Sequence, residues 1–122
     1  MSNHVAKPII KQIKDSRDAL DFFETVSLPK EDDKTQEIIM NFPTVYIHNW
    51  KESGDFEVYV GESNDIFKRT RQHYDVASDK SRWQSKLLEK DASLFIIGHE
   101  HFNKSLTLDI ENRLMHYMMS VD

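Results

Sequence analysis

The residues best able to do chemistry are a basic pair on one expected helix and a carboxylate on another. Apolar spacing predicts a helix over 65–77, in which Arg69 and His73, at i and i+4, share one shoulder of the apolar face. In the last helix, predicted over 105–121, Glu111 falls inside the apolar arc. A buried carboxylate must be paired, neutralised or metal-bound, and such a charge is typical of an active site. The alternatives are a buried salt bridge to Arg69 or another basic group, and a rotated helix that exposes Glu111.

Two tyrosines lie on the segment that must pack beside this helix. Residues 44–49 and 56–61 alternate between apolar and polar types, and a Ser-Gly-Asp turn joins them, which predicts a β-hairpin. If the aliphatic residues of both strands face the core, Tyr46 and Tyr59 share the opposite face. Gly61 ends the second strand without a side chain and leaves room for a group to approach the backbone.

The remaining elements complete an α+β pattern. A continuous apolar run predicts a buried strand over 94–98, and a serine cap begins a short helix over 81–90. Residues 1–42 form a charged N-terminal helical extension, with one helix capped by Ser16. The order of elements predicts a small three-stranded, mainly antiparallel sheet flanked by helices.

Composition excludes several classes of protein. The 122 residues fit one domain, and the absence of cysteine excludes disulfide frameworks, zinc–cysteine modules and thiol catalysis. The sequence has no apolar run of about 18 residues that would span a membrane. The N-terminus lacks the pattern of a signal peptide, so we expect a cytoplasmic protein.

Charge is unevenly distributed along the chain. The net charge is −5, which alone argues against a nucleic-acid partner, yet residues 62–90 carry 7 basic and 5 acidic residues. A solvated helix face explains this excess as readily as a binding surface does. Within this segment, Trp83 beside Lys80, Arg82 and Lys86 would stack on bases or would simply be buried in an amphipathic helix.

A second, weaker constellation is His99-Glu100-His101. Two imidazoles on one face at the end of a strand would suit a transition metal. No third ligand is evident in the sequence, so the metal hypothesis for this triplet stays weak.

The hairpin and the helix after it resemble the GIY-YIG nuclease domain family. Val45-Tyr46 is followed by Tyr59-Val60-Gly61, then by Arg69 and His73, and Glu111 resembles the family's metal-binding glutamate. Either tripeptide alone would be a weak signal, but the two together with the ordered arginine, histidine and glutamate are specific. The resemblance implies the family's sandwich of a small sheet and helices.

The resemblance also implies a reaction, the hydrolysis of a nucleic-acid phosphodiester, DNA in particular, by in-line attack of water. Glu111 would bind one Mg²⁺ or Mn²⁺, and Arg69 would bind the scissile phosphate. Tyr46 would be the general base, its pKa lowered from about 10 by the metal and the arginine. Tyr59 would position water or phosphate, and His73 would relay the proton or hold Tyr46.

Substrate contacts would come from Gly61 and from the basic residues that follow it. These expected substrate-binding residues are Gly61, Lys68, Arg71, Lys80, Arg82 and Lys86.

The resemblance covers residues 43–122, and 1–42 lie outside the family's core fold. Thr44 stands where the family has its leading glycine. Similar bacterial modules head longer proteins with a P-loop ATPase, so a fused or associated ATPase or helicase-like partner is expected. Two alternatives remain: a catalytically weak or inactive module of this fold that binds or targets nucleic acid, and, more remotely, an unrelated ligand-binding domain.

Overall fold

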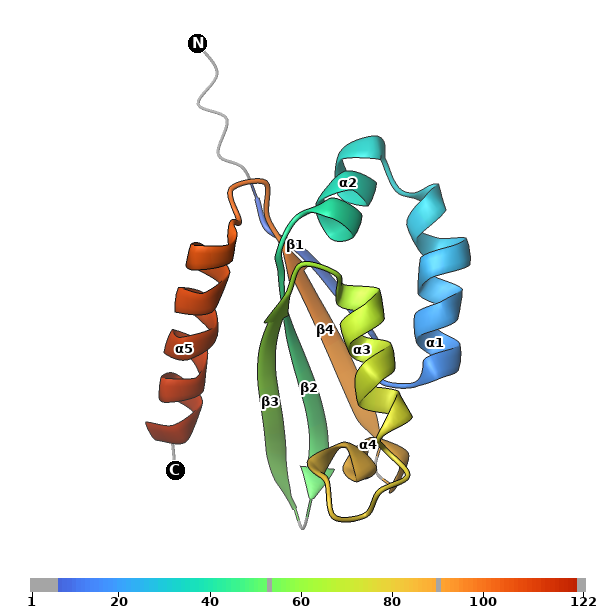
Figure 1. The fold of residues 1–122 in the computed structure, drawn as a ribbon, viewed down its shortest axis with the longest axis vertical. Coiled ribbons are helices and arrows are strands. Elements are labelled where there is room, and N and C mark those ends of the chain that lie inside the picture. The colour runs from blue at the N-terminus through green and yellow to red at the C-terminus, as the bar shows by residue number, and fades with distance from the viewer. Residues whose placement is uncertain (1–6, 53, 90, 121–122) are drawn as a thin grey trace.

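A four-stranded antiparallel sheet forms the centre of the structure (Figure 1). The computed structural model describes residues 7–52, 54–89 and 91–120. The strands lie side by side in the order β1-β4-β2-β3, and each neighbouring pair is antiparallel. In chain order they are β1 (Ile9–Lys14), β2 (Thr44–Glu52), β3 (Asp55–Ser63) and β4 (Ala92–Gly98).

The fourth strand corrects the expected three-stranded sheet. β1 comes from the segment expected to be wholly helical, and it pairs with β4 from Ile9 opposite Gly98 to Lys14 opposite Ser93. Its burial alternates, with Ile9, Lys11 and Ile13 less exposed than the residues between them. A six-residue strand with lysines at both faces carries a weak alternating signal in sequence, so pairing with β4 decides its conformation.

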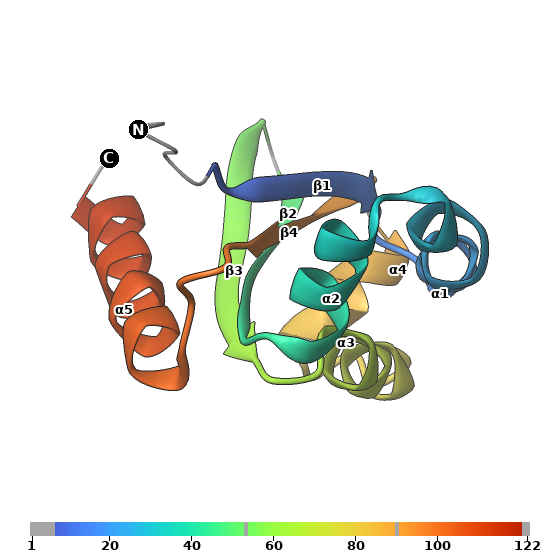
Figure 2. The ribbon, with the colours of Figure 1, turned by 90° about the horizontal axis from the view of Figure 1, so that it is seen from above.

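Helices cover both faces of the sheet (Figure 2). α1, α2, α3 and α4 lie on one side, whereas α5 lies on the other and contacts β3 and β2. The helices are α1 (Arg17–Phe22), α2 (Asp33–Asn41), α3 (Ile66–Asp75), α4 (Lys86–Glu89) and α5 (Lys104–Ser120). Shorter turns are a π-helical one at Phe23–Ser27 and 3₁₀ ones at Leu28–Lys30 and Trp83–Ser85.

Side-chain caps fix where three helices begin. The Ser16 hydroxyl accepts from the backbone N–H of Ala19 at the start of α1, as the sequence predicts. The carboxylate of Asp32 accepts from the backbone N–H of Thr35 at the start of α2, and that of Asp65 accepts from the backbone N–H of Lys68 at the start of α3. Because each cap satisfies a helix N–H that has no partner within the helix, the short polar residues set the boundaries.

The N-terminal segment shares its hydrophobic core with the rest of the chain. The core beneath α1–α3 combines four residues from 16–42 with five from later elements. Its members are Leu20, Phe23, Leu28 and Ile39, together with Tyr46, Ile66, Phe67, Leu94 and Ile96. The segment before residue 43 is therefore part of this packing unit.

The register of the hairpin decides which side chains meet. Gly54 adopts a positive φ of 89° at the turn, and Tyr46 then lies opposite Gly61, and His48 opposite Tyr59. Directly opposed residues point to the same face of a sheet, so Tyr46 and Tyr59 share one face, as the alternation predicts. That face lies beneath α1–α4. The other face is apolar as well, and Val45 and Val60 on it are buried.

The predicted helix over 81–90 is shorter and less regular than expected. A 3₁₀ turn at Trp83–Ser85 leads into the four-residue α4.

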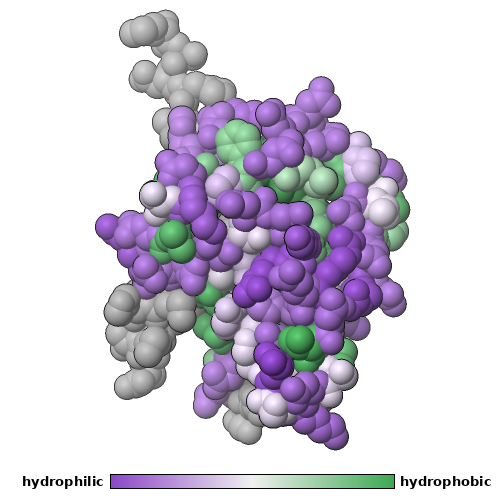
Figure 3. Space-filling view, in the orientation of Figure 1, coloured by the Kyte–Doolittle hydropathy of each residue, from purple (hydrophilic) through white to green (hydrophobic). Residues whose placement is uncertain are grey.

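Hydrophilic side chains cover the region of α3 in the view of Figure 3. Among the described residues, no helix combines the length and the apolarity needed to cross a membrane.

Candidate active site

Tyr46 is buried because Gly61 lets its ring cross the neighbouring strand. The tyrosine is 1% exposed, and its ring lies directly over the glycine. A Cβ at position 61 would overlap the end of the ring that carries the hydroxyl. The glycine therefore makes room for the phenol itself, which is a more definite role than the expected approach of substrate to the backbone.

His73 holds the Tyr46 hydroxyl from α3. Its Nε2 lies 3.1 Å from Tyr46 Oη, and both side chains are buried. On the other side of the ring, the amide nitrogen of Gln84 lies 3.0 Å from Nδ1. Since an amide nitrogen only donates, Nδ1 accepts, and in the neutral ring Nε2 carries the proton and donates to Tyr46. Burial and the charges of His48 and Arg69 lower the pKa of His73 to about 4, so this ring is neutral at physiological pH.

Arg69 approaches the same hydroxyl from the solvent side. Its guanidinium interacts with the phenols of Tyr46 and Tyr59, and these contacts raise the pKa of the arginine. It also donates to Gln72 Oε1 at 3.3 Å. The arginine is exposed, so part of its donor capacity faces solvent and is open to an anion.

The protonation of Tyr46 differs from the expected one. The hydrogen bond from Arg69 lowers its pKa as anticipated, but burial outweighs this effect and raises the pKa to about 12. The arginine by itself therefore does not lower the pKa of Tyr46 below its usual value, and a lowering by metal and arginine together stays a prediction. At rest Tyr46 is a neutral phenol whose oxygen faces two donors, His73 Nε2–H and the guanidinium. Two such donors stabilise a phenolate when one forms.

Glu111 lies on the face of α5 turned toward the sheet. It is half-buried, and burial together with the nearby carboxylate of Glu62 raises its pKa, while Lys104 opposes the shift. Its charge also contributes to the raised pKa of Tyr46, so it is within electrostatic reach of the phenol. The sequence prediction of a carboxylate in the apolar arc agrees with this position.

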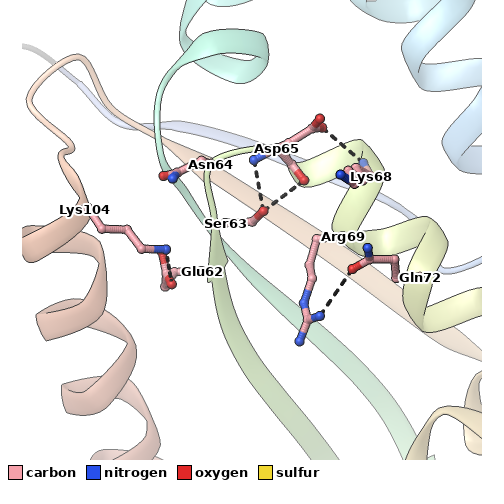
Figure 4. A pocket seen from close by; sticks show the side chains of 8 residues that line it. All are labelled: Glu62, Ser63, Asn64, Asp65, Lys68, Arg69, Gln72 and Lys104. Atoms are coloured by element: carbon pink, nitrogen blue, oxygen red, sulfur yellow. Dashed lines mark hydrogen bonds and ion pairs between the residues drawn. The ribbon is translucent and has the colours of Figure 1, made fainter.

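Lys104 and Glu62 form an ion pair between α5 and β3. The lysine Nζ lies 2.5 Å from both carboxylate oxygens, and the Glu62 side chain is only 10% exposed. Thr107 Oγ1 donates to the same carboxylate at 3.4 Å. Figure 4 shows this pair on one side of β3 and Arg69, from α3, on the other. The pair thus neutralises one carboxylate beside Glu111.

A shallow pocket of about 440 Å³ lies between Arg69 and the Lys104–Glu62 pair, and Tyr46, His73 and Glu111 are not among its lining residues. Three cations line it, namely Lys68, Arg69 and Lys104, and they outnumber the two carboxylates in its wall. Figure 4 shows its full lining, which is Glu62, Ser63, Asn64, Asp65, Lys68, Arg69, Gln72 and Lys104. Lys68 therefore lines the same pocket as Arg69, and its expected contact with substrate stays a prediction.

The other expected substrate contacts lie elsewhere or are already engaged. Arg71 lies away from Arg69 and forms ion pairs with Asp21 and Glu24 of the N-terminal segment, at 2.7 and 2.6 Å. Arg82 pairs with Asp79 at 3.4 Å. Lys80 is exposed and Lys86 is half-buried, both near the Trp83 turn.

Tyr59 forms part of an aromatic stack at the edge of the site. Its ring is 4.2 Å from that of Trp83 between centroids and nearly parallel to it, at 19°. Trp83 is nearly parallel to Trp50 as well, at 5.6 Å and 11°. The tryptophan also covers His48 and His73, at 5.3 and 5.1 Å. The indole is half-buried, which lies between the two expectations, a base-stacking surface and a buried core residue.

Several polar residues around the site are not among those expected from the sequence. Gln84 lies outside every motif, and its role depends on the turn that brings it to α3. His48 is two residues beyond Tyr46 and shares its face, so alternation would have placed it, but Asp15, its partner, is 33 residues away. Glu62 directly follows Gly61, and only the position of Lys104 shows its charge to be paired.

Among the described residues, the structure adds no third metal ligand to the His99-Glu100-His101 triplet. The two imidazoles lie 5.2 Å apart between ring centroids, and Glu100 pairs with Lys34 at 2.8 Å. Within residues 7–52, 54–89 and 91–120, no group of three or more histidine and acidic side chains is arranged to hold a metal ion.

Comparisons with known proteins add no relative to this description. No family model, curated protein or solved structure matches the chain. The functional argument therefore depends on the geometry of the site itself.

Proposed function

We propose that this chain is a divalent-metal-dependent endonuclease domain that hydrolyses phosphodiester bonds in DNA. The observation that carries the proposal is the convergence of His73 and Arg69 on the buried hydroxyl of Tyr46. Glu111 from a separate helix lies within electrostatic reach of that hydroxyl. The resemblance to GIY-YIG nucleases, carried by the same residues, supports the same reaction.

The anion site favours a phosphate as the reacting group. The guanidinium of Arg69 is exposed at the pocket and offers a permanent cation with forked donors. Lys68 lies beside it on α3 and adds a second positive charge. A phosphodiester held there would contact Arg69, whose guanidinium also meets the phenol of Tyr46, and charge developing on the phosphoryl oxygens would be stabilised by the arginine.

Tyr46 is the group best placed to take a proton from attacking water. Its oxygen accepts from His73, whose ring is held by Gln84, so the acceptor is fixed in direction. With a pKa of about 12 the phenol is protonated at rest, so it would act as a base only after releasing that proton to solvent, and the resulting phenolate would be a strong base. Two donors on the oxygen offset part of the cost of forming that phenolate in a buried position.

The chemistry of Glu111 on α5 favours a hard divalent cation as the metal of this proposal. Mg²⁺ prefers oxygen ligands and is commonly held by one or two carboxylates together with waters and substrate phosphate. Glu111 would be its ligand, whereas the nearby carboxylate of Glu62, whose charge raises the pKa of Glu111, is paired with Lys104 and would join only if that ion pair opened. When bound, the cation would polarise the phosphate and help the leaving oxygen depart.

A cleavage assay with matched variants tests the proposal. Supercoiled plasmid and single-stranded DNA are incubated with Mg²⁺ or Mn²⁺ and the wild type, Glu111→Gln, Arg69→Ala or Arg71→Ala. We expect the first two variants to lose activity by about 100-fold or more. Arg71→Ala is the control, because it removes a cation from the same helix on the side bound to Asp21 and Glu24. Equal product with the wild type and with Glu111→Gln would reject the proposal.

Two observations favour a second candidate, a nucleic-acid-binding module that has lost or weakened its chemistry. Tyr46 is 1% exposed, and the charge of Glu62 is already matched by Lys104. A gel shift without cleavage under Mg²⁺ and Mn²⁺ would support this candidate. Cleavage by the wild type that Arg69→Ala removes would exclude it.

A further inference from the structure

A buried chain of hydrogen bonds lies behind the catalytic pair. Nδ1 of His48 is bonded to Oδ2 of Asp15, and the hydroxyl of Tyr74 donates to Oδ1 of the same carboxylate at 2.6 Å. His48 is 0% exposed and Asp15 is 3% exposed. Because a carboxylate only accepts, Nδ1 of His48 carries a proton. The imidazole of His48 is thus hydrogen-bonded to Asp15, and the same carboxylate is hydrogen-bonded to Tyr74 of α3.

The ring of His48 packs against both members of the Tyr46–His73 pair. It lies 5.2 Å from the ring of His73, at 78° between planes, and 5.4 Å from that of Tyr46, at 79°. Both contacts have the edge-to-face geometry that aromatic rings prefer. Trp83 closes the remaining side at 5.3 Å. Any rotation of His48 would therefore displace the rings whose hydrogen bond defines the proposed base.

The second nitrogen of His48 makes this arrangement costly. Nε2 is buried and has no hydrogen-bond partner within the described part of the chain. An unsatisfied buried polar atom typically costs about 1–3 kcal/mol, whereas an apolar ring at position 48 would avoid that cost. Such costs concentrate at functional sites, where they are offset elsewhere in the structure.

We infer that Asp15 and His48 are positioning residues of the nuclease site and that they hold the Tyr46–His73 hydrogen bond in place. This inference rests on the proposed function. Asp15 immediately follows β1, so the N-terminal segment supplies a working part of the site. The carboxylate fixes the imidazole through Nδ1, and the imidazole fixes the rings of His73 and Tyr46 by contact. Substrate binding through Arg69 is left unchanged.

The kinetic test compares two substitutions of the same carboxylate. Asp15→Asn keeps an oxygen that accepts from Nδ1–H of His48, whereas Asp15→Leu keeps the approximate volume and removes the acceptor. We expect kcat for cleavage of a DNA oligonucleotide to fall about 10- to 100-fold in the Leu variant, with KM unchanged, and only about threefold in the Asn variant. Lys11→Met is the matched control, since it removes an ion pair of β1, with Glu31, and leaves the bonds of Asp15 and His48 in place.

A spectroscopic readout separates positioning from a general loss of stability. In ¹⁵N spectra of the wild type, we expect a proton on Nδ1 of His48 and a protected proton on Nε2 of His73. In Asp15→Leu the His73 proton should exchange quickly with water while the backbone amide spectrum is retained. If the Leu variant does not fold, the wild-type spectrum still decides, because a His48 with unprotonated Nδ1 overturns the inference.

The outcomes also separate this inference from the proposed function. Cleavage by the wild type with an unchanged kcat in Asp15→Leu overturns the positioning role and leaves the nuclease proposal standing. A loss in Asp15→Asn as large as in the Leu variant overturns it too, since the amide oxygen still accepts from His48. A wild type that cuts neither plasmid nor oligonucleotide under Mg²⁺ or Mn²⁺ overturns both.

Discussion

The two halves of the candidate site are built in opposite ways. The interior half, which comprises Tyr46, His73, Gln84, His48 and Asp15, is buried and joined by hydrogen bonds between uncharged or internally paired groups. The rim, which comprises Glu62, Lys68, Arg69, Lys104 and Glu111, is more exposed and dominated by full charges. The interior fixes geometry, whereas the rim has charges that a substrate or a cation can engage.

This contrast has an energetic basis. A buried donor or acceptor that loses its partner costs the full desolvation of that group, so the interior tolerates few changes. Exposed charges are screened by water, and an ion pair there contributes about 0–1 kcal/mol. Substitutions in the interior should therefore lower both stability and activity. Substitutions at the rim should change activity and leave the fold nearly intact.

The strongest test of the interior half is Gly61→Ala. The added Cβ would overlap the Tyr46 ring, which is enclosed on every side. We expect the free energy of unfolding to fall by about 3–4 kcal/mol, because overpacking at a rigid strand forces the ring and the backbone apart. Urea denaturation followed by circular dichroism measures the loss.

Gly98→Ala is the matched control for this prediction. Its added Cβ would lie 2.8 Å from Cγ2 of Ile38 and 3.4 Å from Cδ1 of Ile39, a less severe overlap than the one with the Tyr46 ring. A smaller loss is expected there. Equal losses in the two variants would mean that the tyrosine is less constrained than the burial of its ring indicates.

The pH dependence of stability is the next largest effect. His73 has a pKa of about 4 in the folded chain, below its usual value of 6.5, because burial disfavours its charged form. Its neutral form contributes fully above pH 6.5, and the contribution is lost as pH falls toward 4, since the unfolded chain then binds the proton first. We expect the free energy of unfolding to drop by about 2–3 kcal/mol over this range from this group.

Urea unfolding at pH 7, 5 and 4 measures that drop. In His73→Gln the part of the pH dependence that comes from this residue should disappear. His101→Gln serves as the control, because His101 is exposed. An unchanged pH dependence in His73→Gln would contradict the prediction, because it would mean that the pKa of this ring is the same in the folded and unfolded chains.

The smallest effect is expected at the rim, from Lys104→Met. The lysine side chain is 50% exposed, but its partner Glu62 is only 10% exposed, so we expect the free energy of unfolding to fall by about 1–2 kcal/mol. Removing its charge leaves Glu62 and Glu111 with a stronger negative potential. The Mg²⁺ concentration needed for half-maximal cleavage should then fall about threefold or more.

Lys34→Met is the control for the rim. It removes a comparable exposed ion pair, with Glu100, at a distance from the pocket lining. A drop of several kcal/mol in the free energy of unfolding of Lys104→Met would contradict the division into a rigid interior and a rim whose charges contribute little to the fold.

The local pattern of the sequence was enough to predict the helices and strands that carry the site residues. Alternation in 44–49 and 56–61 predicts the hairpin, and the two tyrosines do share a face. Helical spacing predicts α3, with Asp65 as its cap. The apolar arc of α5 predicts that Glu111 faces inward, and its half-burial agrees. These features depend on neighbours within a few residues, which a sequence displays directly.

Only the tertiary structure decided the remainder. β1 becomes a strand by pairing with β4, whose paired residues lie 79 to 89 positions further along the chain. Asp15 reaches His48 across 33 residues, and Lys104 reaches Glu62 across 42. The pKa of Tyr46 rises to about 12 because enclosure by the core outweighs the arginine beside it. Residue types and local spacing determine which groups are available for chemistry, but desolvation and long-range partners, which depend on packing, determine their protonation and charge.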